Sequence, residues 1–365
     1  MPELLGPRGA AAAGIPELQV AVHCTHTHGA PIADLNAQLL LDRQPGAPVH
    51  LDVPFLKDLS NRAALALGES LATLRPFTHV GVGKAKVEQY ASNRRIPAAD
   101  GRVKSRMSAC KDPELCSAPE GLIDPWLRTV TLFDADRPLV RLHYYATHPQ
   151  SHYGTEASPD VPGFARARLE KDEGIPHLYF TGCGGNVAAG KYNDGSPEAR
   201  VQLSESLYKA MRGSMGSTRA VPVDRIGWKV ADIAFALRQE QAFSEFQFKK
   251  DLADPKATDV ARLKAALALA WYHRLKDRPG VECSRLTIGP ATILHLPGEA
   301  FVEYQLYAQS LRPDDFIAVA AYGEGGPGYL CMDGSVAEGG YETSASYVGP
   351  PSEVRFKATI AELLR

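Results

Sequence analysis

The sequence predicts an α/β protein with a mixed β-sheet core flanked by helices. Runs with strand character alternate along the chain with runs of helical spacing, and two hairpins interrupt this alternation. Alternating strands and helices favour parallel strand pairs, whereas hairpins are antiparallel, so the sheet is expected to be mixed. No linker is recognisable, which predicts a single domain over residues 1–365.

Strand signals are short runs rich in β-branched and aromatic residues that alternate or are continuously apolar. They cover residues 18–26, 79–90, 176–182, 228–238 and 315–323, and the hairpins cover residues 128–148 and 284–296. Helix signals are apolar residues three or four positions apart, strengthened by Pro near the start or Gly at the end. They cover residues 56–74, 162–174, 197–211, 256–278 and 352–365, and a further helix is expected after Pro297-Gly298.

The composition excludes several classes of protein. The chain of 365 residues carries 40 Lys and Arg against 42 Asp and Glu, a net charge of −2, so no nucleic acid is expected as a partner. No apolar run approaches the roughly 20 residues of a membrane span. The six cysteines form no CxxC pair, and the N-terminus does not resemble a signal peptide, although it could be incomplete. A cytoplasmic protein with reduced thiols is therefore expected.

The segment from Ala91 to Ile123 has the scattered Pro, Cys and charge of a loop. A loop of this length inside a compact domain is usually functional or mobile. It could be a specificity lid over a site or plain surface.

The stretch HCTHTHG places His26 and His28 two positions apart at the end of a predicted strand. Residues i and i+2 of a strand face the same side, so both imidazoles are expected in one cavity. One could bind a metal ion while the other acts on a substrate. For either histidine alone, a solvated or hydrogen-bonded structural residue would be the better interpretation.

Three further strand ends carry polar chemistry, and strand ends are where ligand sites of α/β proteins assemble. His148 ends one strand, and His152, four residues later, is as well explained by a surface loop. A cluster at Gly182, Gly184 and Gly185 could bring backbone close to a ligand, or form an ordinary turn. Glu299 follows Pro-Gly and could be a metal ligand or an exposed first-turn acid. Two His and one carboxylate form a common catalytic zinc set.

Taken in order, these motifs resemble the neutral/alkaline (non-lysosomal) ceramidase superfamily, in its zinc-dependent catalytic domain. The matching blocks are Thr25-His26-Thr27-His28-Gly29-Ala30-Pro31, Asn93-Arg94-Arg95-Ile96-Pro97, His148, Pro297-Gly298-Glu299, and Gly328-Tyr329 followed twelve residues on by Tyr341-Glu342. The resemblance runs from about Leu18 to the C-terminus. It implies a ceramidase-like catalytic fold.

The resemblance also implies residue roles. Zinc would be held by His26, His148, Glu299 and Tyr329. The residues implied to act on the substrate carbonyl or its tetrahedral intermediate are His28, Arg94 and Tyr341. The tyrosine ligand follows from the resemblance alone, since half-buried packing would otherwise explain Tyr329 and Tyr341.

The sequence departs from the family at several points. The Gly-Asp-Val-Ser block of the ceramidases aligns with Gly185-Asn186-Val187-Ala188, so the serine proposed to take part in attack is replaced by Ala188. Asn186 could donate to the substrate but cannot act as a base.

No counterpart of the family's C-terminal immunoglobulin-like domain is present, and few residues precede His26. Asp160 could orient a ligand histidine or cap a helix.

The leading hypothesis is a zinc-dependent hydrolase that attacks an amide-like or ester bond with metal-activated water. Its partner would be a small-molecule substrate, acylated or glycosylated. Two alternatives stay open: a metal-dependent lyase or carbohydrate-active enzyme on the same scaffold, and a non-catalytic, metal-stabilised binding protein. Neither the identity of the substrate, ceramide included, nor the oligomeric state nor the metal used in vivo follows from the sequence.

Overall fold

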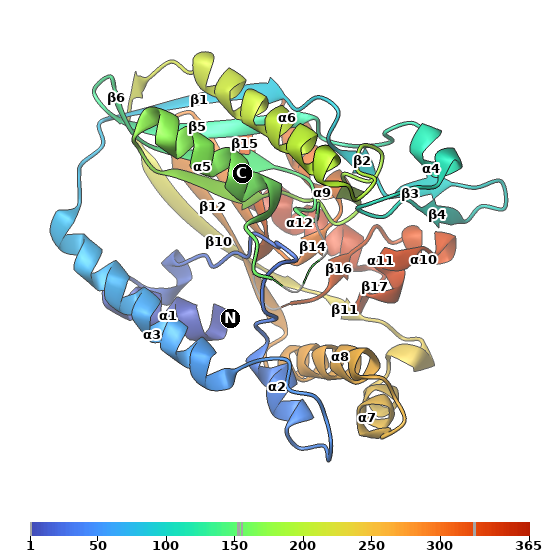
Figure 1. The fold of residues 1–365 in the computed structure, drawn as a ribbon. Helices are drawn as coiled ribbons and strands as arrows, with labels where there is room; N and C mark the ends of the chain where they lie inside the picture. The colour runs from blue at the N-terminus through green and yellow to red at the C-terminus, as the bar shows by residue number, and fades with distance from the viewer. Residues whose placement is uncertain (1, 152–153, 155, 324–325) are drawn as a thin grey trace.

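The computed structural model describes residues 2–151, 154, 156–323 and 326–365. Two β-sheets pack face to face, and helices cover both outer faces, which makes four layers (Figure 1). The predicted α/β class with mixed sheets flanked by helices is confirmed. The strands are divided between two main sheets, a division that the strand signals alone do not reveal.

The first sheet has five strands in the order β7-β6-β5-β1-β9. Their bounds are β1 (His79–Lys86), β5 (Trp126–Asp134), β6 (Arg137–Tyr145), β7 (His177–Thr181) and β9 (Val221–Pro222). The predicted hairpin is β5–β6, and β7 runs parallel to β6. Because β7 is parallel to β6, both strands end at the same edge of the sheet, where His148 and the glycine cluster follow.

The second sheet has the order β10-β12-β13-β15. Its strands are β10 (Ile226–Ala234), β12 (Gly280–Ile288), β13 (Ala291–Pro297) and β15 (Phe316–Gly323). The predicted hairpin is β12–β13, and β15 pairs parallel to β13. Two short strands beyond β13 and β15, β14 (Glu299–Ala300) and β16 (Tyr329–Leu330), pair with each other in parallel.

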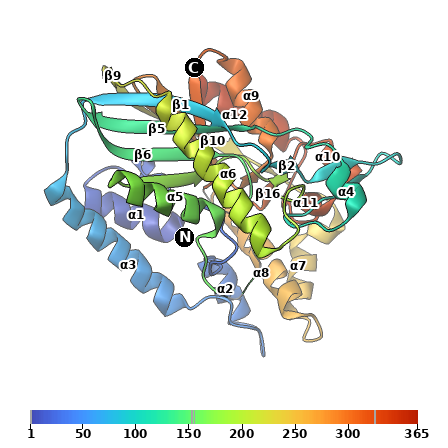
Figure 2. The same cartoon turned by 45° about the horizontal axis from the view of Figure 1, so that its top comes forward.

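Amphipathic helices bury the outer faces of the sheets. Helices α5 (Asp160–Glu173) and α6 (Pro197–Gly216) lie on the first sheet, as Figure 2 shows. Helices α9 (Val302–Leu311) and α12 (Ser352–Leu364) pack on the second. Helices α2 (Leu35–Leu41), α7 (Glu245–Ala253) and α8 (Asp259–Asp277) form a separate apolar cluster below the sheets, and α1 (Pro2–Ala13) lies against α3 (Val53–Ser70) (Figure 1).

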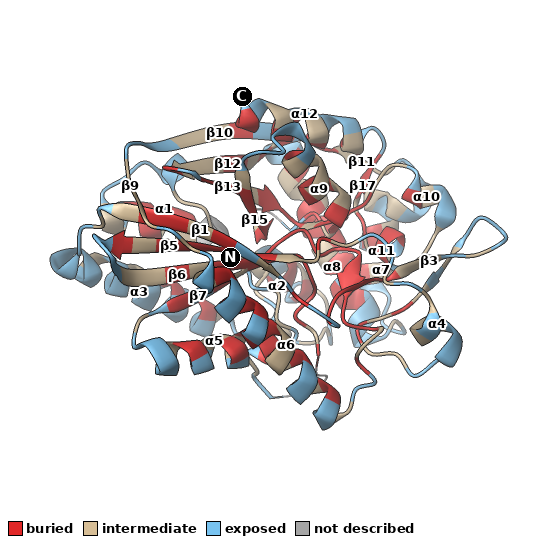
Figure 3. Cartoon of the chain, turned by 90° about the horizontal axis from the view of Figure 1, so that it is seen from above, coloured by how far each residue is buried: buried red, intermediate tan, exposed pale blue. Residues whose placement is uncertain are grey.

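The interior between the two sheets is apolar. Val80 and Val130 of the first sheet meet Ile293 and Ala318 of the second, all at most 1% exposed. Figure 3, seen from above, shows buried strands in both sheets, with exposed residues mainly on the outer sides of the helices. This rigid double layer supports the loops at the strand ends.

The strand predicted over residues 18–26 is absent. Within it His23 forms a single β-bridge with Gly323, and Cys24 donates its backbone N–H to Tyr322 O at 3.1 Å. His26 then adopts a left-handed backbone with φ of 61°, which ends the extended pairing. The segment crosses the end of β15 instead of joining a sheet.

The segment 91–123 contains short elements and is tied to the body of the protein. It includes β2 (Ser92–Asn93), β3 (Arg95–Pro97), β4 (Val103–Ser105) and α4 (Pro113–Ser117). The guanidinium of Arg106, 1% exposed, donates to the carbonyls of Asn93, Leu115, Ala118, Pro119 and Glu120. These bonds favour the interpretation as packed surface over a lid.

Among the described residues, no helix combines the length and the apolar character that a bilayer crossing requires.

Two fully buried histidines lie side by side on the first sheet. His143 Nε2 is 2.9 Å from His177 Nδ1, and His143 Nδ1 is 2.8 Å from Thr129 Oγ1. At the other end of the pair, His177 Nε2 lies 3.3 Å from Glu173. Burial, reinforced by the neighbouring His177, holds the pKa of His143 well below its ordinary value. His143 is therefore neutral in the folded protein.

This burial predicts a loss of stability in acid. Unfolding returns the pKa of His143 to about 6.5, so below that pH the unfolded chain binds a proton that the folded chain does not. The free energy of unfolding should fall as the pH drops below about 6.5, with His143 contributing up to about 1.4 kcal/mol per pH unit. Urea titrations from pH 8 to 5 would show this slope, and His143→Gln should reduce it. His273→Gln, at a position whose side chain is 40% exposed, is the control; an equal slope in wild type and His143→Gln would contradict the prediction.

Candidate metal centre

The sheet edge brings together predicted ligands from four distant parts of the chain. His148 follows β6, Glu299 begins β14 directly beyond β13, and Tyr329 begins β16. The parallel pairing of β14 with β16 sets Glu299 opposite Tyr329. His26 reaches the same place from the N-terminal segment, where Thr181 Oγ1 donates to Thr25 O at 2.7 Å.

Two imidazole nitrogens converge on one carboxylate oxygen. His26 Nε2 and His148 Nε2 each lie 3.2 Å from Glu299 Oε2. The ring of His26 is fixed by stacking on Tyr322, with ring centroids 4.3 Å apart. His28 joins the group, since ligand atoms of His26, His28 and His148 all lie within 4.8 Å of one another.

The tautomer of His148 shows why this arrangement fits a cation. His148 Nδ1 lies 2.7 Å from the carbonyl of Gly184, and a carbonyl only accepts, so Nδ1 carries the proton. Nε2 then presents a lone pair to the Glu299 carboxylate, which repels it unless a positive charge lies between them. His26 Nε2 is buried and makes no hydrogen bond within the described part of the chain. The donor set therefore fits a metal ion that accepts nitrogen and oxygen ligands.

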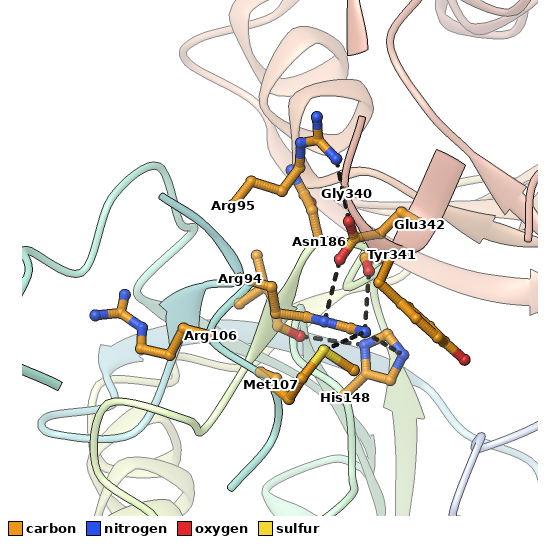
Figure 4. Close-up of polar contacts among 12 residues, drawn as sticks. Arg94, Arg95, Arg106, Met107, His148, Asn186, Gly340, Tyr341 and Glu342 are labelled. Atoms are coloured by element: carbon orange, nitrogen blue, oxygen red, sulfur yellow. Dashed lines mark hydrogen bonds and ion pairs between the residues drawn. The ribbon is translucent and has the colours of Figure 1, made fainter. Parts of the chain in front are cut away.

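Arg94 lies beside this group and is 1% exposed; Figure 4 shows its guanidinium next to the imidazole of His148. Its Nη1 is 3.3 Å from His148 Nε2 and donates to Tyr329 Oη at 3.2 Å. Tyr329 Oη is in turn 3.4 Å from His148 Nε2, which places the tyrosine oxygen at the candidate centre. The guanidinium also lies 5.3 Å from the ring of Tyr341, whose side chain lines the cleft.

Burial and the contacts of His148, Glu299, His28 and Tyr329 shift the pKa values of these groups. Burial lowers the pKa of His148, so the ring is neutral. Burial alone would raise the pKa of Glu299, but the neighbouring His26 holds it well below its usual range. Burial lowers the pKa of His28 to about 3, helped by His26 and His148, although part of the residue reaches solvent. Burial raises the pKa of Tyr329 well above its usual value, and the hydrogen bond from Arg94 opposes that rise.

The glycine cluster allows a close approach of backbone segments. A Cβ at Gly185 would lie 2.2 Å from the carbonyl oxygen of Glu299, and Gly185 donates its N–H to Ala300 at 2.9 Å. Gly184 supplies the carbonyl that orients His148. Of the two interpretations of this cluster, close backbone approach is the one that the structure displays.

Several predicted residues lie outside the centre. Asn186 is fully buried, with Oδ1 accepting from Val302 N–H and Nδ2 donating to Glu303, so we give it a structural role at the start of α9 instead of a contact with substrate. Asp160 accepts from Ser151 through both backbone and hydroxyl, and it orients that loop.

Two further predicted positions are Ala188 and His152. Ala188 is buried in β8 (Val187–Ala188), paired with Ser92. His152 lies outside the described residues.

A cleft of about 760 Å³ opens over the candidate centre. His26, His28, Glu299 and Tyr341 line one part of it. The remaining wall is largely apolar and comes from α7, α8 and neighbouring loops, including Phe243, Phe248, Ala265, Ala268, Trp271 and Tyr347. The helical wall of the cleft was not predicted from the sequence, because a helix signal does not indicate which sheet edge the helix faces. Tyr322 was not predicted either, since its only signal is its position at the end of a predicted strand.

No protein-family model matches the sequence, and no curated protein matches it. Among solved structures, the chain is similar to a ceramidase complexed with C2, with a TM-score of 0.70, 14% identity, and coverage of 99% of this chain and 64% of that one. It is also similar to the neutral ceramidase from Pseudomonas aeruginosa, with a TM-score of 0.68, 14% identity, and coverage of 99% and 63%. The chain thus has the ceramidase fold and spans less than two thirds of these ceramidase chains.

The geometry predicts which substitutions remove ligand atoms from the candidate centre. His26→Ala and Glu299→Gln should each lose stoichiometric zinc after loading and dialysis, because each removes an atom that faces the shared centre. Metal content per chain, measured by mass spectrometry, tests this. His273→Ala, a half-exposed histidine on α8, is the matched control and should retain zinc. Full zinc content in both ligand variants would show that the centre lies elsewhere.

Proposed function

We propose that the protein is a zinc-dependent hydrolase that cleaves an amide-like bond in a small-molecule substrate. The observation that carries the proposal is the convergence of His26 Nε2 and His148 Nε2 on one oxygen of Glu299, directly under a cleft. His26, His148, Glu299 and Tyr329 would hold the ion. Bound zinc lowers the pKa of a water ligand to about 7 and supplies the hydroxide for hydrolysis.

The surrounding side chains suit acyl transfer. His28 is neutral near pH 7, because its pKa is lowered, so it can accept a proton and deliver it to a leaving nitrogen. The Tyr341 hydroxyl, in the cleft wall, donates to the oxyanion that forms on the carbonyl. Arg94 is too deeply buried to meet the substrate in this arrangement, and it acts by donating to Tyr329.

The cleft supports a substrate with an apolar part. Polar groups gather at the metal end, while Ala265, Ala268 and Trp271 of α8 line an apolar wall. Such a division suits an acyl group whose carbonyl lies over the centre and whose chain follows α8. The ceramidase fold adds support for an N-acyl substrate. His28 and Tyr341 would be unnecessary in a protein that only binds metal, which favours an enzyme over a binding protein.

The direct test is turnover of N-acyl amides with and without metal. The zinc-loaded protein should hydrolyse amides of medium and long acyl chains faster than acetyl amides, esters or glycosides. Chelation should abolish the activity, and added zinc should restore it. Acyl release would be measured by chromatography. Equal turnover by the chelated protein, or turnover restricted to glycosides, would refute the proposal.

A second variant separates catalysis from metal binding. His28→Ala should retain stoichiometric zinc but lose about 10²- to 10⁴-fold in turnover, because a proton-transfer group is removed while the ligands remain. His26→Ala is its counterpart and should lose both zinc and activity. Loss of zinc in His28→Ala would instead make His28 a ligand, which the three-histidine cluster also permits geometrically.

A further inference from the structure

A buried carboxylate beside the candidate centre has no role in the scheme above. Glu342, in the short helix α11 (Tyr341–Ser344), is fully buried and follows the cleft residue Tyr341 directly. Its Oε1 lies 3.2 Å from Arg94 Nε, and its Oε2 lies 3.1 Å from Arg95 Nη1. Figure 4 shows the carboxylate between the two guanidinium groups, with the imidazole of His148 on the far side of Arg94.

The two arginines depend on Glu342 to different degrees. Arg95 also meets Glu338 Oε2 at 2.9 Å and donates to the carbonyls of Gly339 and Ser335. For Arg94, Glu342 is the acid on the Nε side, while Nη1 on the opposite side reaches Tyr329 and His148. The contact at Nε is an ion pair without the geometry of a hydrogen bond, so Glu342 acts on Arg94 by charge: it attracts the Nε edge of the guanidinium and favours the placement in which Nη1 faces Tyr329 and His148.

Charge gives the contact a second consequence. A guanidinium 3.3 Å from a ligand nitrogen repels any divalent cation that this nitrogen binds. An anion on the opposite side of the same guanidinium offsets that repulsion, and the low exposure of both groups keeps solvent from screening it.

We infer that Glu342 is a positioning residue of the metal centre: it orients Arg94 toward Tyr329 and His148 and neutralises it, so that a divalent cation can bind beside it. The inference rests on the proposed zinc site. Glu342 acts through Arg94 and does not touch the ion or the substrate.

The test is a double-mutant cycle on zinc affinity, which requires no substrate. The dissociation constant of zinc would be measured by chelator competition for wild type, Glu342→Gln, Arg94→Met and the double variant. Glu342→Gln should weaken zinc binding about tenfold in the wild-type background and less than about threefold in the Arg94→Met background, as expected for residues in direct contact. Equal weakening in both backgrounds would overturn the inference, because Glu342 would then act independently of Arg94.

Glu338→Gln is the matched control. Glu338 pairs with Arg95 but not with Arg94, and its side chain is 48% exposed, so its loss should leave zinc affinity unchanged. If it weakens zinc binding as much as Glu342→Gln does, general disturbance of this region explains both effects, and the inference fails.

Folding must be monitored, because removing one partner of a buried ion pair is strongly destabilising. Thermal unfolding of each variant would be recorded, and Glu342→Asp, which keeps the charge, should recover part of the zinc affinity if Glu342→Gln does not fold. No recovery by a folded Glu342→Asp would count against the inference. A wild-type protein that binds no zinc would instead overturn the proposed function itself.

Discussion

The hydrogen bond from His148 Nδ1 to the carbonyl of Gly184 fixes the chemistry of the whole centre. It commits the proton to one nitrogen and turns the lone pair of the other toward Glu299. The carbonyl can take this place because the glycine loop packs against the backbone of Glu299, where a side chain at Gly185 would collide. Backbone packing thus determines a protonation state, and this protonation state leaves Nε2 with a lone pair that could bind a metal ion.

Much of the fold was predictable from local patterns. Both hairpins, the helix after Pro297-Gly298 and the C-terminal helix carry periodicities that decide their type locally. The division of the strands into two sheets was not predictable, since strand signals look alike whichever sheet they join. The segment through His26 failed as a strand because only one β-bridge, from His23 to Gly323, joins it to the end of β15, and the left-handed residue that ends this pairing leaves no mark in the sequence.

The candidate site likewise has a part that could be predicted from the sequence and a part that could not. His26, His28, His148 and Glu299 stood out because unusual residue types recur at predicted strand ends, and the structure brings them together. Asn186 drew attention because it takes the place of an Asp in an aligned block, and its polar atoms are used to start α9. The apolar wall on α8 and the buried pair of Arg94 with Glu342 depend on contacts between segments hundreds of residues apart, which no local pattern encodes.

The origin of the ligands in the two sheets has a mechanical consequence. His148 extends from the first sheet, while Glu299 and Tyr329 lie just beyond strands of the second, and His26 belongs to neither. An ion held by all four would cross-link the two packed sheets at an edge where their apolar packing gives way to polar loops. Its affinity would then count toward the cohesion of the protein, since a ligand that binds only the folded chain adds its binding free energy to stability.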